Sequence, residues 1–157
     1  MSDNYMAVEL FDEGIAAFLR GDFEASIKTF TQTLEHDPKF ALAYSSRGAA
    51  YLKSGHIKKA ISDFNRAIRL NPYYARAHHL RGLAYEQMGD FASAYRNFDR
   101  ALELDPDLAV AYRKRDCVFD KSLDDCLDDG IAIEDLEMTD HLEAIRVALY
   151  SADEKAA

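Results

Sequence analysis

The chain has no tryptophan, only two cysteines and only three prolines among its 157 residues. The cysteines, Cys117 and Cys126, are too few to make a disulfide framework, so an apolar core must hold the fold together. No apolar run approaches the roughly 18–20 residues that a membrane-spanning helix needs. Residues 1–5 also lack the basic and apolar regions of a secretory signal. These absences favour a cytoplasmic protein of one domain.

Motifs for chemistry are equally scarce. The sequence contains no G-x-S-x-G motif, no G-x-G-x-x-G motif and no phosphate-binding loop. The cysteines do not form the Cys-x2-Cys pair that is typical of zinc sites. In the acidic run 124–130, a calcium loop built on Gly130 would place Leu127 and Leu136 at two of its ligand positions. We therefore expect no catalysis, no metal and no cofactor.

Glycine and proline, although few, recur at one fixed interval. Pro38, Pro72 and Pro106 follow one another at an interval of 34 positions. Six of the seven glycines form pairs seven residues apart that repeat at the same interval: Gly14/Gly21, Gly48/Gly55 and Gly82/Gly89. Because these residue types punctuate backbone geometry, their period indicates a repeated structural unit.

Bulky side chains keep the same interval. The series are Phe30, Phe64 and Phe98; Leu34, Ile68 and Leu102; Arg47, Arg81 and Arg115; and Tyr44, His78 and Tyr112. Repeat two reads Gly48-x2-Tyr51, Ala60-x3-Phe64 and Pro72, and repeat three has the same residue types 34 positions later. This pattern resembles the tetratricopeptide repeat (TPR) family, whose unit has the same length and the same spacing of these residue types.

The resemblance implies an all-α fold, a TPR α-solenoid of antiparallel helix pairs with a C-terminal capping helix. The expected helices span residues 7–20, 23–36, 41–54, 57–70, 75–88 and 91–104. Gly21, Gly55 and Gly89 should end the first helices in a left-handed conformation, and Asp22 and Asp90 should cap the helices that follow. Mid-helix glycines indicate close contact between paired helices, and we expect Gly14, Gly48 and Gly82 to lie opposite Ser26, Ala60 and Ala94.

The expected organisation of the whole chain has four parts. These are a flexible N-terminus (1–6), the TPR domain (7–122), an acidic linker (123–139) and an amphipathic C-terminal helix (140–151). Within the TPR domain, the repeats cover 7–40, 41–74 and 75–108, and the capping helix covers 109–122. The last helix is predicted from the capping box Asp140-x-x-Glu143 and from one apolar face.

Charge divides the chain into a basic body and an acidic tail. Residues 39–115 hold 14 Lys and Arg against 7 Asp and Glu, whereas residues 116–143 hold 11 Asp and Glu against Lys121 alone. Two interpretations of the acidic segment stay open: a solvated mobile linker, or a lid that folds over the body and competes with a partner.

In the TPR family, stacked first helices line a concave groove that holds an extended or helical peptide. The positions carried over to this chain give a groove that is apolar at its N-terminal end and basic at its C-terminal end. Its candidate residues are Phe11, Ile15, Leu42, Ser45, Ser46, Ala49, Arg76, His79, Leu80, Leu83, Arg113 and Lys114. His79 should face the groove, and His78 should pack in place of a larger ring.

Chaperone-binding members of the family use a clamp of Lys, Asn and Arg side chains for a terminal carboxylate. The matching positions here are Phe11, Ile15, Ser46, Arg76 and Leu80, of which only Arg76 keeps the charge. Recognition of a chaperone tail by such a clamp is therefore disfavoured.

The sequence thus predicts a non-catalytic adaptor that holds a protein or peptide partner of acidic and apolar character in the groove. The alternative is a self-assembling scaffold, in which the repeat ends or the helix 140–151 make a homo-oligomer. Nucleic acid is not an expected partner, because the basic body lacks a recognisable reading motif and the tail would oppose binding.

Overall fold

The computed structural model describes residues 3–108 and Arg115, and within these residues the secondary structure is entirely helical. The helices are α1 (Asp3–Leu19), α2 (Phe23–His36), α3 (Ala41–Lys53), α4 (Ile57–Leu70), α5 (Ala75–Gln87) and α6 (Phe91–Leu104). This confirms the predicted all-α class. The expected acidic linker and C-terminal helix, and all of the expected capping helix except Arg115, lie outside the described residues.

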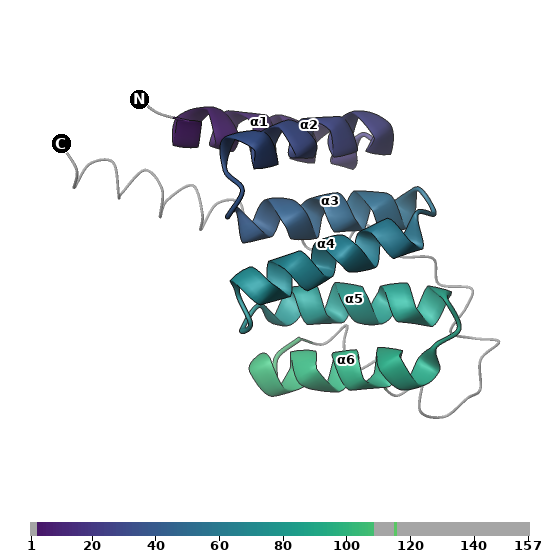
Figure 1. The fold of residues 1–157 in the computed structure, drawn as a ribbon. Helices are drawn as coiled ribbons and strands as arrows, with labels where there is room; N and C mark the ends of the chain where they lie inside the picture. The colour runs from purple at the N-terminus through teal and green to yellow at the C-terminus, as the bar shows by residue number, and fades with distance from the viewer. Residues whose placement is uncertain (1–2, 109–114, 116–157) are drawn as a thin grey trace.

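The helices form three hairpins that stack in sequence order (Figure 1). The most extensive contacts join the two helices of each hairpin, α1 with α2, α3 with α4 and α5 with α6. Between hairpins, α2 packs on α3 and α4 packs on α5. The first helices also touch one another, α1 with α3 and α3 with α5, more extensively than the second helices do. The stack therefore curves so that α1, α3 and α5 lie on its inner side.

The turns within hairpins follow the predicted chemistry. Gly55 has a φ of +83°, the left-handed conformation that glycine adopts without a steric penalty. The carboxylates of Asp22 and Asp90 each accept a hydrogen bond of 3.1 Å, from the backbone N–H groups of Ala25 and Ser93 respectively. These bonds satisfy N–H groups that the first turn of a helix leaves without intrahelical partners.

The helix α1 begins at Asp3, so residues 3–6 of the predicted flexible N-terminus are helical, four residues before the predicted start of this helix. Ala7, one turn further on, is fully buried and ties this turn to the rest of the fold. At their C-terminal ends, α1, α3 and α5 each stop one residue earlier than predicted.

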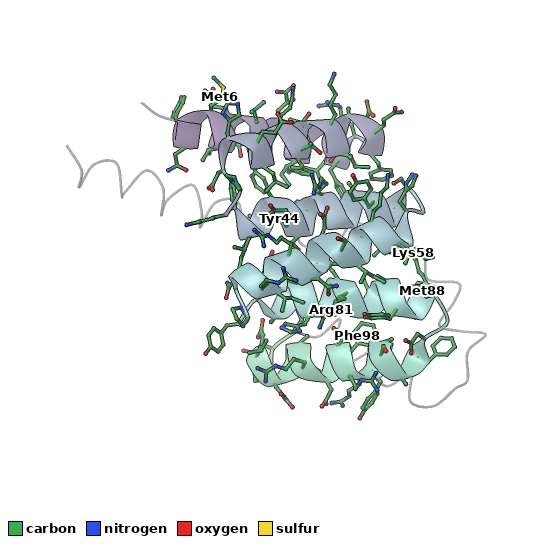
Figure 2. The ribbon with its side chains drawn as sticks, in the orientation of Figure 1. Met6, Tyr44, Lys58, Arg81, Met88 and Phe98 are labelled. Carbon is green, nitrogen blue, oxygen red and sulfur yellow. The ribbon has the colours of Figure 1, made fainter. Side chains whose placement is uncertain are left out.

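Mid-helix glycines make room for phenylalanine rings. A Cβ on Gly48 would lie 2.6 Å from Cε1 of Phe64, and equivalent clashes would join Gly14 to Phe30 and Gly82 to Phe98. The ring of Phe98 lies between α5 and α6 (Figure 2). The nearest neighbours are therefore these aromatic rings, not the expected Ser26, Ala60 and Ala94. A flat ring can approach the backbone of the facing helix only where that helix lacks a Cβ.

An arginine that recurs once per repeat also links neighbouring repeats. Arg81 donates from Nη1 to Oδ1 of Asn65 in the preceding repeat, at 2.8 Å. Arg115 is the next member of this series and makes a 3.7 Å ion pair with Asp99. The inter-repeat register therefore continues at least to Arg115.

Candidate functional site

The inner side of the stack carries the predicted binding positions. We call it the first-helix face, and its described members are Phe11, Ile15, Leu42, Ser45, Ser46, Ala49, Arg76, His79, Leu80 and Leu83. Leu42 and Arg76 are partly exposed, and the other eight are buried. Arg113 and Lys114 lie outside the described residues.

The N-terminal end of the first-helix face is apolar. The ring centroid of Phe11 lies 4.9 Å from that of Phe40 and 5.5 Å from that of Phe30. Ile15 and Leu42 belong to the same hydrophobic cluster. Phe11 and Ile15 thus anchor the first repeat to the second, and Leu42 extends the apolar surface toward solvent.

In the middle of the first-helix face, two residues with hydroxyl groups occupy the positions that an aromatic pair occupies in the first repeat. Ser45 and Tyr74 are the equivalents of Phe11 and Phe40 one repeat later, and their hydroxyl groups are hydrogen-bonded. Burial raises the pKa of the Tyr74 phenol, against the smaller opposing effects of the Ser45 hydrogen bond and the nearby positive charge of Arg76. The face therefore changes from an aromatic pair to a hydroxyl pair between the first and second inter-repeat junctions.

Phe40 and Tyr74 were not among the residues that repeat counting assigned to the groove. Both are the N-cap residues of first helices, α3 and α5, so they stand just outside the helical positions that were counted. Their separation by one full repeat is the signal in the sequence that identifies them as an equivalent pair.

The C-terminal part of the face combines a histidine with core leucines. His79 is buried and its ring lies 5.5 Å from that of Phe98, so it packs on the second helix of its own repeat. Leu80 and Leu83 belong to the central hydrophobic cluster together with Ala49. These leucines therefore contribute to the packing of the repeats as well as to the inner side of the stack.

Charge changes sign along the first helices. The helix α1 carries Asp3, Glu9, Asp12 and Glu13 and no lysine or arginine. The helix α3 carries Arg47 and Lys53 and no acidic residue. The helix α5 carries Arg76, Arg81 and Glu86. The side chains of Arg47 and Arg81 are hydrogen-bonded to the second helices α4 and α6. The other cationic side chains that a ligand would meet along the first helices are therefore Lys53 on α3 and Arg76 on α5.

The described residues contain no group of three or more His, Cys, Asp or Glu side chains placed to hold a metal ion. None of the described helices is long and apolar enough to cross a bilayer.

Comparison with known proteins identifies similar sequences and structures. Two family models match the chain, one described as TPR repeat over residues 50–89 and one as tetratricopeptide repeat over residues 75–108. No curated protein sequence matches it. Many solved structures do, and three of them illustrate the likeness.

The first TPR of Spaghetti (RPAP3), bound to the HSP90 peptide SRMEEVD, is 27% identical with a TM-score of 0.74, over 76% of this chain and 95% of that chain. The Sgt2 TPR domain from Aspergillus fumigatus is 29% identical with a TM-score of 0.71, over 74% of this chain and 78% of that chain. The TPR2B domain of yeast Sti1, in a complex with pHsp70, is 30% identical with a TM-score of 0.67, over 73% of this chain and 94% of that chain. Repeat period, helix arrangement and these likenesses together show that the chain belongs to the tetratricopeptide repeat family.

Proposed function

We propose that this protein is a non-catalytic adaptor that binds a peptide segment of a partner protein along the first-helix face. The observation that carries the proposal is the contrast between the two partly exposed side chains of that face, apolar Leu42 on α3 and cationic Arg76 on α5. A uniform apolar surface would favour self-association, whereas a graded surface selects one sequence and one direction of an extended ligand. The small number of cysteines favours the cytoplasm as its compartment.

The polarity of the face defines the ligand. An apolar side chain of the ligand would lie near Leu42, which is partly exposed beside the aromatic pair. Acidic side chains would lie near Arg76 and Lys53, because charge-assisted hydrogen bonds to carboxylates are the stronger ones. We therefore infer a ligand with an apolar anchor toward α1 and acidic residues toward α5.

Similar solved domains support a peptide ligand of this kind. The HSP90 peptide in the Spaghetti complex, SRMEEVD, contains three acidic residues. The second TPR domain of human RPAP3, 28% identical to this chain, is in complex with the HSP70 peptide SGPTIEEVD. In this chain Phe11 and Ile15 belong to a buried apolar cluster, so four of the five clamp positions carry no charge here. We propose an acidic and apolar segment held by Arg76 and Leu42 in place of a clamped terminal carboxylate.

The experiment compares Arg76→Glu with Arg69→Glu in affinity capture from the native cell, with partners identified by mass spectrometry. Arg76 lies on the first-helix face, and Arg69 is an exposed arginine of α4 that serves as the matched control. We expect Arg76→Glu to lose the partner and Arg69→Glu to keep it, with the same helical circular dichroism. Equal capture by both variants would overturn the proposal. Leu80 is unsuitable for this test because it belongs to the central core.

A second candidate function is self-assembly, and one observation favours it. Tyr5, Met6 and Leu19 of α1 are 50%, 47% and 44% exposed. Met6 projects from the outer side of α1, away from the other helices (Figure 2). Under this candidate, light scattering of the full chain shows a mass that rises with concentration, and Met6→Lys with Leu19→Lys abolishes the rise. If light scattering shows a monomer at every concentration, self-assembly is excluded as a function.

A further inference from the structure

The order of charge and apolar residues beyond Arg115 matches the order of chemistry on the first-helix face. We propose that residues 116–151 of this chain occupy that face, with the acidic part against α5 and α3 and the segment 140–151 against α1. The segment would then act as an internal competitor of the partner. This inference rests on the proposed function only in taking the first-helix face as the peptide-binding surface.

Charge complementarity is the first support. Residues 116–143 carry 11 acidic side chains and one lysine. The first helices that lie at the C-terminal side of the stack, α3 and α5, present Lys53 and Arg76. The segment 140–151 carries Arg146 against two acidic residues, and α1 has four acidic residues and no basic one. The strongly acidic part of the segment would therefore lie on α5 and α3, which have a net positive charge, and only the less acidic part would lie on the acidic helix α1.

Apolar complementarity follows the same order. Leu142, Ile145 and Leu149 share one face of the predicted helix 140–151. At the α1 end, Val8 and Leu42 are partly exposed and Leu19 is exposed, which gives these side chains a surface to cover. Burying apolar area in this way contributes about 25 cal/mol per Å². Charge alone does not determine where the predicted helix 140–151 binds. The apolar side chains at the α1 end provide its proposed binding surface.

The path of the chain permits this docking. Leu108 packs with Ala101 and Leu102 at the end of α6, so the chain leaves the repeats beside the last hairpin, α5 and α6. From α5 to α1 is two helix spacings of about 8–10 Å each, or roughly 20 Å. The 24-residue stretch from Asp116 to Asp140 reaches about 80 Å when extended, at roughly 3.3 Å per residue. The acidic part can therefore cross the face and deliver the segment 140–151 to α1.

The outer surface of the stack is the competing location, and it fits less well. The helix α4 exposes Lys58, Lys59, Arg66 and Arg69, which would attract an acidic segment. Its other exposed side chains are Ser62 and Asn65, and its apolar residues are at most partly exposed (Ile57, Ile61, Ile68 and Leu70). The helix α4 therefore has no fully exposed apolar side chain comparable to Leu19 of α1. The two locations differ in which lysine a bound carboxylate would meet, Lys53 on α3 or Lys58 and Lys59 on α4.

Zero-length cross-linking of the full chain with a carbodiimide tests the location, because it joins only carboxylates and amines already in contact. We expect mass spectrometry to find bonds from acidic residues of 116–143 to Lys53. Mixing isotope-labelled and unlabelled chains identifies bonds within one molecule. Bonds confined to Lys58 and Lys59, bonds only between molecules, or no bond to Lys53 would each overturn the proposal.

Competition is tested with a fluorescent synthetic peptide that has the sequence of residues 116–151. The full chain is compared with a variant in which Asp124, Asp125, Asp128 and Asp129 are changed to Asn. We expect the variant to bind the peptide at least about fivefold more tightly, because its own segment competes less well. The control variant, Glu24→Gln with Glu35→Gln, removes exposed acids of α2 and should bind as the unchanged chain does.

Equal affinity of the four-residue variant and the unchanged chain, or no binding to either, would overturn the docking of the tail. Neither result bears on the proposed adaptor function. That function fails only if Arg76→Glu and Arg69→Glu capture the same partners.

Discussion

Arg47 holds Asp63 by a two-point salt bridge, in which Nε and Nη2 donate to the two carboxylate oxygens at 2.7 Å each. The hydrogen bond that Arg47 donates to Asp63 is the main cause that raises the pKa of Arg47 above its usual value. A third donor, Nη1, reaches Oγ1 of Thr31 in the preceding repeat at 3.1 Å. One side chain of α3 thus fastens its own hairpin and the junction with the first repeat.

Removing this arginine should destabilise the fold strongly. In Arg47→Ala, the carboxylate of Asp63 stays buried without its cation, and we expect a loss of about 3 kcal/mol in the free energy of unfolding. Arg81→Ala is the matched change one repeat later, where the acceptors are the neutral amides of Asn97 and Asn65. Its cost should be smaller, about 1.5 kcal/mol, because no buried charge is left without its partner. Urea unfolding followed by circular dichroism measures both, and equal losses would contradict the assigned importance of the charged pair.

Filling the space at a mid-helix glycine should also destabilise the protein. The methyl group of Gly48→Ala would lie 2.6 Å from the Phe64 ring, and overpacking of this kind costs roughly 1–3 kcal/mol. Adding Phe64→Leu should make the two effects less than additive, because the smaller side chain removes the clash. Gly55→Ala provides the contrast, since no atom lies within 4 Å of its new methyl group and only its φ of +83° opposes it. An additive double variant would refute the proposed contact.

Stability should fall in mild acid through His78. Burial lowers the pKa of this imidazole below the ordinary value near 6.5, although the Pro72 carbonyl oxygen, 3.2 Å from Nε2, acts in the opposite direction. As pH falls through about 6.5, His78 becomes protonated in the unfolded chain while it is still neutral in the folded chain. The free energy of unfolding therefore decreases. His78→Tyr restores the ring found at Tyr44 and should reduce this pH dependence. Urea unfolding at about pH 7.5 and about pH 5.5 checks it, and an unchanged pH dependence in the variant would show that other groups titrate.

The clamp peptide of the Spaghetti complex should bind this chain poorly. At the positions aligned with the family clamp, Phe11, Ile15, Ser46 and Leu80 offer no charge to a terminal carboxylate. Each missing charge-assisted hydrogen bond removes about 1.5–3 kcal/mol. Fluorescence anisotropy with SRMEEVD should therefore give a Kd of about 1 mM or weaker. Micromolar binding that a scrambled peptide does not reproduce would restore the clamp interpretation.

Local sequence was sufficient for the helices and their turns. Gly55 and the N-cap carboxylates of Asp22 and Asp90 act on backbone groups only a few residues away, so their roles could be predicted from spacing alone. The repeat period then identified equivalent positions, because each repeat packs on its neighbour in the same way. The family, the hairpins and the inner positions of the first helices follow from these two facts.

Only the tertiary structure decided which of those positions belong to the core. Counting placed ten described residues on the binding surface, yet eight of them are buried, and Leu80 and Leu83 belong to the central cluster. It also left out Phe40 and Tyr74, which complete the apolar and polar pairs of the face. Burial depends on the curvature of the stack and on the size of side chains from neighbouring repeats. Those contacts join residues that are far apart in the sequence, so the period locates a position but not its surroundings.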